Sequence, residues 1–317
     1  MDSESSYPKL PSLDFSKPAG VMKPGSPQWE TLKSQVREAV EEYGCFEASF
    51  DRVSDDVRRA VFESLEELFE LPLETKLRNA SNKPCRGYVG QHPLIPLYES
   101  LGIDDAQVPE SVESFTNTLW PQGNSSFSKT MQSYLEQLSE LDKIVRKMIV
   151  ESFGLESYMD EHMSSTKYLL RFMKYDSPNT PDAKLGLSPH TDNNTVTILH
   201  QNQVEGLEVQ TKDGRWINIQ PSPTSFIVII GEALRAWLNG RLHSPRHRVM
   251  MSGNETRYSL GLFTTPKSGC VIQTAGAMVD EKHPLLFKPY DHEKFMAFYY
   301  TEAGQRAASA LQAYCGI

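Results

Sequence analysis

The chain has 317 residues, of which 39% are hydrophobic and 23% charged, and its formal net charge is −9. This composition is typical of a globular protein with one large domain or two modest ones. The negative charge disfavours nucleic acid and anionic membranes as partners. No stretch approaches the roughly 18 to 20 apolar residues of a membrane span. We therefore expect a soluble enzyme or binding protein.

Cysteine usage and the N-terminal segment indicate the compartment. The four cysteines, Cys45, Cys85, Cys270 and Cys315, lack the paired spacing of a zinc ribbon or a disulfide framework. They fit a reducing compartment. Residues 1–15 contain neither the basic nor the apolar region of a secretory signal. We expect a cytoplasmic protein, and a monomer.

The first half of the chain favours helices. Apolar side chains recur at helical spacing in residues 29–43 and again in residues 128–153, which predicts two amphipathic helices. A further helix is expected over residues 54–69, where acidic side chains near the start suit a helix N-terminus. Residues 79–122 are rich in Pro, Gly and Ser, and we expect them to wrap the surface.

The pattern changes near Lys167, after which short β-rich runs alternate with turn signals as far as Gly269. About six to eight strands at this spacing indicate a double-sheet jelly roll or a related barrel. Residues 292–314 return to a helical pattern. We predict a mixed α and β protein, in which a double-stranded β-helix (jelly roll) is wrapped by N-terminal helices and a C-terminal helix. Its three expected parts are a mainly helical region (1–160), the jelly-roll core (161–270) and a C-terminal extension with a helix (271–317).

A set of possible metal ligands lies in the β-rich part. His190 and Asp192 are two residues apart, so on a strand their side chains would point to one face and could bind one ion. Alone the pair is a weak signal, because each residue could equally be an ordinary core or turn residue. Two histidines compete as the third ligand: His247 precedes a β-type run, whereas His243 lies in a turn-like segment. Two histidines and one aspartate leave positions open on an octahedral ion, as in non-haem Fe(II) oxygenases.

A possible anion clamp follows His247. On a strand, Arg257 and Ser259 would share a face. A buried arginine can hold a carboxylate through two charge-assisted hydrogen bonds, and a serine hydroxyl can add a third. 2-Oxoglutarate has such a carboxylate at one end and a metal-chelating 2-oxo acid at the other. Isolated Arg-x-Ser triplets are common on surfaces, so this interpretation depends on the position of the triplet after the histidines.

Together, His190-x-Asp192, His247 and Arg257-x-Ser259 resemble the iron and co-substrate motifs of the plant 2-oxoglutarate- and Fe(II)-dependent dioxygenase superfamily. The resemblance spans nearly the whole chain. Residues 171–175, with residues 199–201 and 261–263, resemble a narrower branch, the AOP group, which in turn resembles dioxygenases for auxin oxidation and hydroxylases of specialised metabolites.

The resemblance implies that His190, Asp192 and His247 hold Fe(II), and that Arg257 and Ser259 hold 2-oxoglutarate. Many members also use an Asn-Tyr-Tyr segment for 2-oxoglutarate. Here Met and Lys precede the tyrosine, so only Tyr175 is carried over as a co-substrate residue. Some halogenating relatives lack the carboxylate that Asp192 provides, which disfavours halogenation.

The reaction that the resemblance implies is oxidation of a small molecule by O2, coupled to decarboxylation of 2-oxoglutarate to succinate and CO2, with ascorbate as the reductant in vitro. Hydroxylation is the first expectation, and demethylation, desaturation and ring closure stay open. The expected substrate is an apolar or mixed plant specialised metabolite. Two alternatives are oxidative inactivation of an auxin-like hormone and a non-catalytic, cupin-like metal-binding protein.

Substrate contacts are expected from aromatic residues outside the motifs, although aromatic residues more often belong to the core. Arg86 and Lys174 are candidates for pairing with a substrate carboxylate. The aromatic candidates are Tyr88, Tyr98, Phe115, Phe263 and Phe298, with Tyr299 beside the last.

Overall fold

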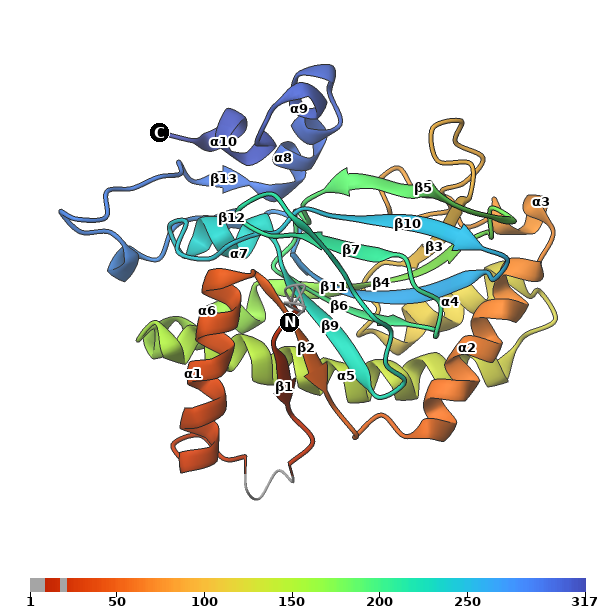
Figure 1. Cartoon of the computed structure of the whole chain (residues 1–317), viewed down its shortest axis with the longest axis horizontal. Helices are drawn as coiled ribbons and strands as arrows, with labels where there is room; N and C mark the ends of the chain where they lie inside the picture. Colours follow the sequence, from red (N-terminus) through yellow and green to blue (C-terminus); the bar gives the residue numbers. More distant parts are fainter. Residues whose placement is uncertain (1–8, 18–21) are drawn as a thin grey trace, which may run out of the picture.

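The computed structural model describes residues 9–17 and 22–317; residues 1–8, half of the segment used to predict the absence of a secretory signal, lie outside the described residues. Two mainly antiparallel sheets form the centre of the protein (Figure 1). The larger sheet has the strand order β1-β2-β9-β6-β11-β4-β3, and the smaller has the order β5-β10-β7-β8. This arrangement confirms the predicted jelly roll.

The strands of the larger sheet are, in spatial order, β1 (Ser12–Asp14), β2 (Cys45–Ser49), β9 (Ser225–Ile230), β6 (Val196–Gln201), β11 (Arg257–Pro266), β4 (Thr166–Tyr175) and β3 (Tyr98–Ile103). Those of the smaller sheet are β5 (Thr180–His190), β10 (His247–Gly253), β7 (Leu207–Gln210) and β8 (Trp216–Asn218). A separate pair consists of β12 (Val271–Ile272) and β13 (Tyr290–Asp291).

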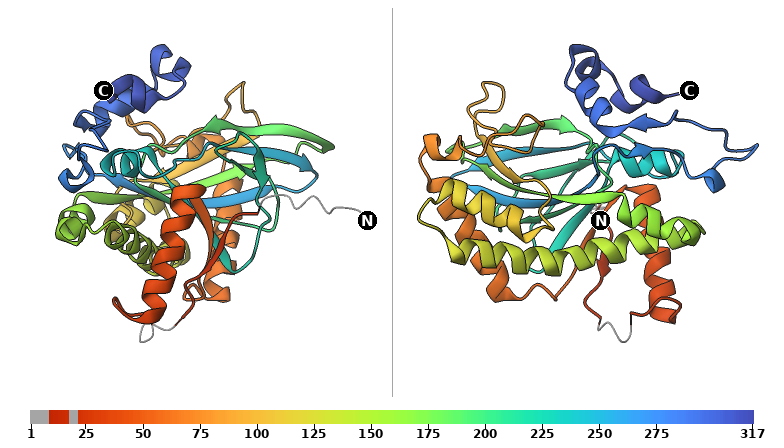
Figure 2. Two further views of the ribbon diagram at one scale, coloured as in Figure 1. Left: turned by 60° about the vertical axis from the view of Figure 1, so that its left-hand side comes forward. Right: turned by 180° about the vertical axis from the view of Figure 1, so that it is seen from behind.

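Helices cover the outer face of the larger sheet, with the long helix α5 running across it (Figures 1 and 2). These helices are α1 (Pro27–Glu42), α2 (Asp55–Glu70), α4 (Pro109–Leu119) and α5 (Ser125–Ser152). The short helices are α3 (Leu73–Lys76), η1 (Glu156–Tyr158), α6 (Met159–Ser164), α7 (Glu232–Trp237), η2 (Gly276–Met278), α8 (His292–Tyr299), α9 (Glu302–Arg306) and α10 (Ala310–Cys315). Within the described ranges, no helix combines the length and apolar character that crossing a membrane requires.

Strand alternation divides the core into two layers. Along β4, Leu170 and Phe172 pack against the helices, whereas Met173 and Tyr175 pack between the two sheets. Successive side chains of a strand point to opposite faces, so a strand buried on both faces supplies both layers. The layer between the sheets is where the predicted site residues meet.

The predicted helices at residues 29–43, 54–69 and 128–153 are confirmed within a few residues as α1, α2 and α5. The Ser54 side chain accepts a hydrogen bond from the Val57 amide, which explains why α2 begins there.

Two predictions about secondary structure were wrong. Residues 79–122 do not simply wrap the surface, because they contain β3 and α4. Strand β3 forms by pairing with β4, a long-range interaction that local composition does not reveal. The C-terminal region forms three short helices because Thr301 and Ser309 each cap a new helix. The region before residue 160 also contributes β1, β2 and β3 to the larger sheet.

Candidate active site

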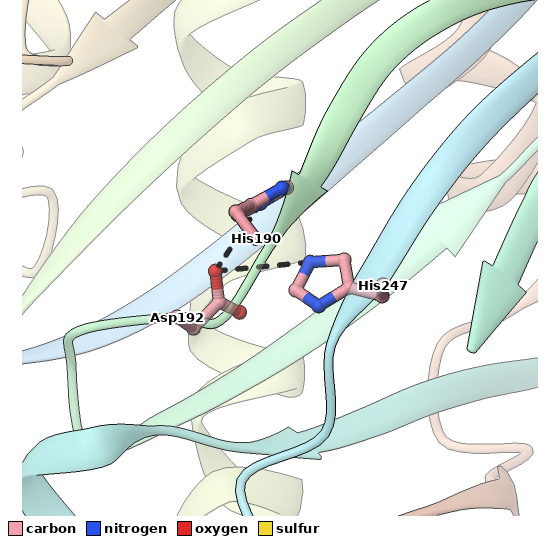
Figure 3. A group of neighbouring side chains, drawn as sticks. All are labelled: His190, Asp192 and His247. Carbon is pink, nitrogen blue, oxygen red and sulfur yellow. Dashed lines mark ion pairs between the residues drawn. The ribbon is translucent and has the colours of Figure 1, made fainter. Parts of the chain in front are cut away.

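Three side chains converge where β5 ends and β10 begins (Figure 3). His190 and His247 are direct partners in the β5–β10 pairing, and Asp192 follows in the loop after β5. The Nε2 atom of each histidine lies 3.8 Å from Oδ1 of Asp192. One possible ligand atom from each residue lies within 4.8 Å of the others, so a single ion can contact all three.

Neighbouring groups orient these side chains toward a common point. The Nδ1 atom of His190 lies 2.8 Å from the carbonyl oxygen of Ser188, which leaves Nε2 for a metal. The Thr197 hydroxyl donates to Oδ2 of Asp192 at 2.6 Å, which leaves Oδ1 facing the two histidines. Burial, followed by the nearby His247, lowers the pKa of His190 to about 4. His190 is therefore neutral at neutral pH, as a metal ligand must be.

Of the two histidines that compete as third ligand, His247 lies in this cluster. The His243 amide instead donates to the Val40 carbonyl at the end of α1, 3.3 Å away. Burial lowers the pKa of His243 to about 4, so it too is neutral, but it is not part of the cluster. Its backbone hydrogen bond ties this loop to α1.

The predicted clamp lies on the larger sheet, where Arg257 and Tyr175 are cross-strand partners. Arg257 is only 1% exposed; its Nη1 donates to Ser259 Oγ at 3.3 Å and its Nη2 to Gln201 Oε1. The ring centroid of Tyr175 lies 5.0 Å from Cζ of Arg257. Gln201 was not predicted, although its position opposite Ser259 places it on the same face.

Arg257 is a buried cation with unmet hydrogen-bonding capacity. Its Nε has no hydrogen-bond partner, and no carboxylate among the described residues pairs with it. Burial therefore lowers the pKa of Arg257, an effect that Tyr175 opposes. A buried donor without a partner costs about 1 to 3 kcal/mol. A carboxylate ligand would satisfy this donor and supply the missing negative charge.

One cavity of about 500 Å³ joins the three metal-ligand candidates to the clamp. Two of the predicted substrate residues, Tyr98 and Phe263, line it. The Tyr98 ring packs 5.1 Å from the Tyr175 ring. The Phe263 ring lies across Gly261, where a Cβ atom would come within 2.4 Å of the ring edge, so a side chain at this position would displace Phe263.

The other three predicted substrate residues do not line the cavity. Phe115 packs against Phe127 and Phe172 in the helix-side core, because it lies on the apolar face of α4. The Tyr88 hydroxyl donates to Glu99, 3.0 Å away. Phe298 packs against Tyr314, with ring centroids 5.2 Å apart. Adjacent residues on a helix point in different directions, so its neighbour Tyr299 reaches the cavity instead.

Of the two basic residues predicted to pair with a substrate carboxylate, only Arg86 lines the cavity. Lys174 forms ion pairs with Asp176 at 2.8 Å and Glu99 at 3.5 Å and does not line the cavity. Arg86 does line it, with Asp104 as an ionic partner 3.3 Å away.

Several cavity residues were not predicted from the sequence, although Arg171 could have been. Once Tyr175 is assigned to the cavity, the two-residue period of a strand places Arg171 and Met173 on the same face. Further unpredicted lining residues are Leu169, Leu199, His292, Met296 and Tyr300.

Comparisons with known proteins agree with this geometry. Residues 161–266 match the family described as the 2OG-Fe(II) oxygenase superfamily, and residues 10–122 match the N-terminal region of non-haem dioxygenases in morphine synthesis. The chain is 53% identical over 315 residues to a protein of Arabidopsis thaliana named probable 2-oxoglutarate-dependent dioxygenase AOP1.2, covering 98% of this chain and 96% of that protein. The chain belongs to the 2-oxoglutarate- and Fe(II)-dependent dioxygenases.

Two solved structures of this dioxygenase family resemble the whole fold. Dioxygenase for auxin oxidation from rice is 27% identical with a TM-score of 0.82, covering 97% of this chain and all of that one. Dioxygenase for auxin oxidation 1 of Arabidopsis thaliana, in a complex with 2-oxoglutarate, is also 27% identical with a TM-score of 0.78, covering 87% of this chain and all of that one.

The site suits the cofactor and co-substrate of this dioxygenase family. When bound, Fe(II) and 2-oxoglutarate supply the oxidising chemistry, in which O2 is consumed as 2-oxoglutarate is decarboxylated to succinate and CO2. His190, Asp192 and His247 would hold the metal from one side. Arg257, which has an unsatisfied Nε, would hold the far carboxylate of 2-oxoglutarate. The cavity walls would orient an organic substrate beside these groups.

Proposed function

We propose that this dioxygenase hydroxylates a small specialised metabolite of plants. The main observation in support is that one cavity joins the metal-ligand cluster to the clamp. The same cavity is also lined by Tyr98, Phe263 and Tyr299. This wall leaves room beside the reacting centre for a mainly apolar organic molecule. The 53% identity to a protein named for the AOP group supports the choice of metabolite class.

A second candidate is oxidative inactivation of an auxin-like acid. It is supported by the resemblance to two dioxygenases for auxin oxidation, with TM-scores of 0.78 and 0.82. At 27% identity, these proteins are more distant than the AOP1.2 relative. We therefore rank auxin-like acids second.

Monomeric state and location belong to the same proposal. All four cysteines are free, which fits the reducing cytoplasm. We expect a monomer, which size-exclusion chromatography with light scattering would test. A fluorescent fusion in plant cells would test the cytoplasmic location.

The function is tested with anaerobically purified protein supplied with Fe(II), ascorbate and 2-oxoglutarate. Oxygen is then admitted in the presence of a plant-metabolite library and, in a separate arm, indole-3-acetate. We expect succinate formation to rise with particular metabolites, and their products to gain the mass of one oxygen atom. Stimulation by indole-3-acetate alone would favour the second candidate. Succinate formation that no compound stimulates would contradict both.

A further inference from the structure

A second cavity arginine, Arg171 of β4, has no acidic partner among the described residues. Its Nη2 donates to the hydroxyls of Tyr98, at 3.0 Å, and Ser100. Its Nε is buried without a hydrogen-bond partner, and no acceptor in the described part of the chain meets Nη1. Of the five N–H groups of the guanidinium, the three on Nε and Nη1 are therefore unmatched by the protein.

Two buried arginines that do not line the cavity are satisfied internally. Arg146 pairs with the buried carboxylate of Asp142 at 2.8 Å, and Arg58 donates to several backbone carbonyl oxygens. Arg257 and Arg171 differ from these two, because each lines the cavity, has an unsatisfied Nε and pairs with no carboxylate among the described residues. Arg86 also lines the cavity, but it pairs with Asp104. For Arg257 the missing anion is the far carboxylate of 2-oxoglutarate. The same reasoning assigns an anion to Arg171.

The space around Arg171 is shaped by glycines on both neighbouring strands. Its cross-strand partners are Gly102 of β3 and Gly261 of β11. A Cβ atom at Gly102 would come within 2.8 Å of the Arg86 carbonyl oxygen, and one at Gly261 within 2.4 Å of the Phe263 ring. Arg86 and Phe263 both line the cavity, and they lie on opposite sides of the cross-strand row formed by Gly102, Arg171 and Gly261.

The position of Arg171 is separate from that of the 2-oxoglutarate clamp. Arg171 and Tyr175 lie on the same face of β4, and Tyr175 is the cross-strand partner of Arg257. Because a strand rises about 3.3 Å per residue, the Cα atoms of Arg171 and Tyr175 are roughly 13 Å apart. An anion at Arg171 would therefore be a group other than the carboxylate at Arg257, which the 2-oxoglutarate affinities below test.

We propose that Arg171, with the hydroxyls of Tyr98 and Ser100, forms a subsite for an oxyanion carried by the organic substrate. The fitting groups are a carboxylate or a sulfate, because both accept charge-assisted hydrogen bonds from a guanidinium. The subsite selects anionic metabolites and holds one end of the molecule while another part faces the metal ligands. The inference rests on the proposed function, since it concerns the substrate of the same cavity.

The test measures binding without turnover. Protein loaded with Fe(II) and 2-oxoglutarate is kept anaerobic, and affinities are measured by isothermal titration calorimetry. The probes are matched pairs: indole-3-acetate and other plant carboxylic acids, each with its methyl ester, and organic sulfates, each with the parent alcohol. Arg171→Gln removes the charge, Arg171→Lys keeps it, and Lys174→Gln is the control, because Lys174 is a cation of the same strand that does not line the cavity and already pairs with Asp176 and Glu99.

We expect at least one acid or sulfate to bind wild-type protein about tenfold more tightly than its uncharged counterpart, the effect of about one charge-assisted hydrogen bond. Arg171→Gln abolishes this preference, Arg171→Lys retains part of it, and Lys174→Gln retains it. The Kd of 2-oxoglutarate changes little in all three. Whether the preferred probes are acids or sulfates identifies the oxyanion.

Three results would overturn the proposal. The first is a panel in which no charged probe binds better than its neutral counterpart. The second is a preference that survives Arg171→Gln. The third is an equal loss of 2-oxoglutarate affinity, which would make Arg171 a co-substrate residue. Should Arg171→Gln fail to fold, as judged by circular dichroism, the selectivity of Arg171→Lys against wild type decides between the same outcomes.

Admitting oxygen separates this inference from the proposed function. Anionic probes that bind through Arg171 but yield no oxidised product would leave the subsite standing and contradict the function. Oxidation of uncharged metabolites that is insensitive to Arg171→Gln would do the reverse.

Discussion

The two ends of the cavity are built differently. At the reacting end, His190 and His247 are paired across two strands, and Arg257 is paired with Tyr175 across two others. At the other end, called the mouth because Cys85 and Tyr300 line the cavity and are partly exposed, the Cys85 sulfur lies 3.1 Å from the Tyr300 hydroxyl.

This difference separates chemistry from specificity. Backbone pairing positions His190, His247 and Arg257, whereas Asp192 lies in the loop after β5 and is oriented by the Thr197 hydroxyl. An exposed ion pair at the mouth, Lys83 with Glu293 at 2.8 Å, is worth little energetically. The side-chain contacts at the mouth can change without altering the β5–β10 pairing, as is common for loops on a rigid scaffold that acquire new specificity. One link joins the two ends, because Nε2 of His292 in α8 lies 2.9 Å from the carbonyl oxygen of Asn193, next to Asp192.

The strongest test of the reacting end is His247→Ala. We expect Fe(II) affinity and succinate formation to fall by more than about 100-fold, because even residues that only orient a ligand contribute 10- to 100-fold. Equilibrium dialysis of the metal and a succinate assay measure the two effects. The matched control His243→Ala should stay close to wild type. Equal losses in both variants would remove His247 from the ligand set.

The clamp should respond almost as strongly. Arg257→Gln should raise the KM for 2-oxoglutarate by about 100-fold or more, because each lost charge-assisted hydrogen bond contributes about 1.5 to 3 kcal/mol. Ser259→Ala should raise it by only about fivefold, since the serine offers one neutral hydrogen bond. Steady-state kinetics with varied 2-oxoglutarate measure both. An unchanged KM in Arg257→Gln would place the co-substrate carboxylate elsewhere.

A smaller effect is expected from the hydroxyl that orients Asp192. Thr197→Val removes the 2.6 Å hydrogen bond to Oδ2 with little change in shape, and should weaken Fe(II) binding by about tenfold. Thr116→Val is a matched control, because that buried hydroxyl donates to the Val112 carbonyl within α4. If both variants bind Fe(II) as tightly as wild type, the orientation of Asp192 does not depend on Thr197.

The mouth should show the smallest effects, divided between two adjacent residues. Tyr299→Ala should alter the KM for the organic substrate, because Tyr299 lines the cavity. Phe298→Ala should leave that KM unchanged. It should lower the free energy of unfolding by at least about 0.5 to 1.5 kcal/mol, which is the contribution of the aromatic pairing of Phe298 with Tyr314. Substrate kinetics and thermal unfolding separate the two. The opposite division would restore Phe298 as a substrate contact.

The sequence alone was sufficient for features that depend on short spacing. A two-residue separation on β11 places Arg257 and Ser259 on one face. The same rule predicted that His190 and Asp192 meet, but Asp192 lies in the loop after β5, where the Thr197 hydroxyl orients its carboxylate. Helical periodicity likewise predicted α1, α2 and α5, because each buries one apolar stripe. The choice of His247 over His243 rested on the β-type run beside His247 together with the motif spacing of the family that the chain resembles.

Tertiary structure decided everything that depends on pairing between distant segments. Strand β3 exists because it pairs with β4, and that pairing surrounds Arg171 with two glycines. Aromatic residues gave no comparable signal: Phe115 and Phe263 are equally apolar, yet one lies in the helix-side core and the other lines the cavity. Apolar burial has no direction of its own, so the packing of neighbouring elements determines which aromatic ring faces the substrate.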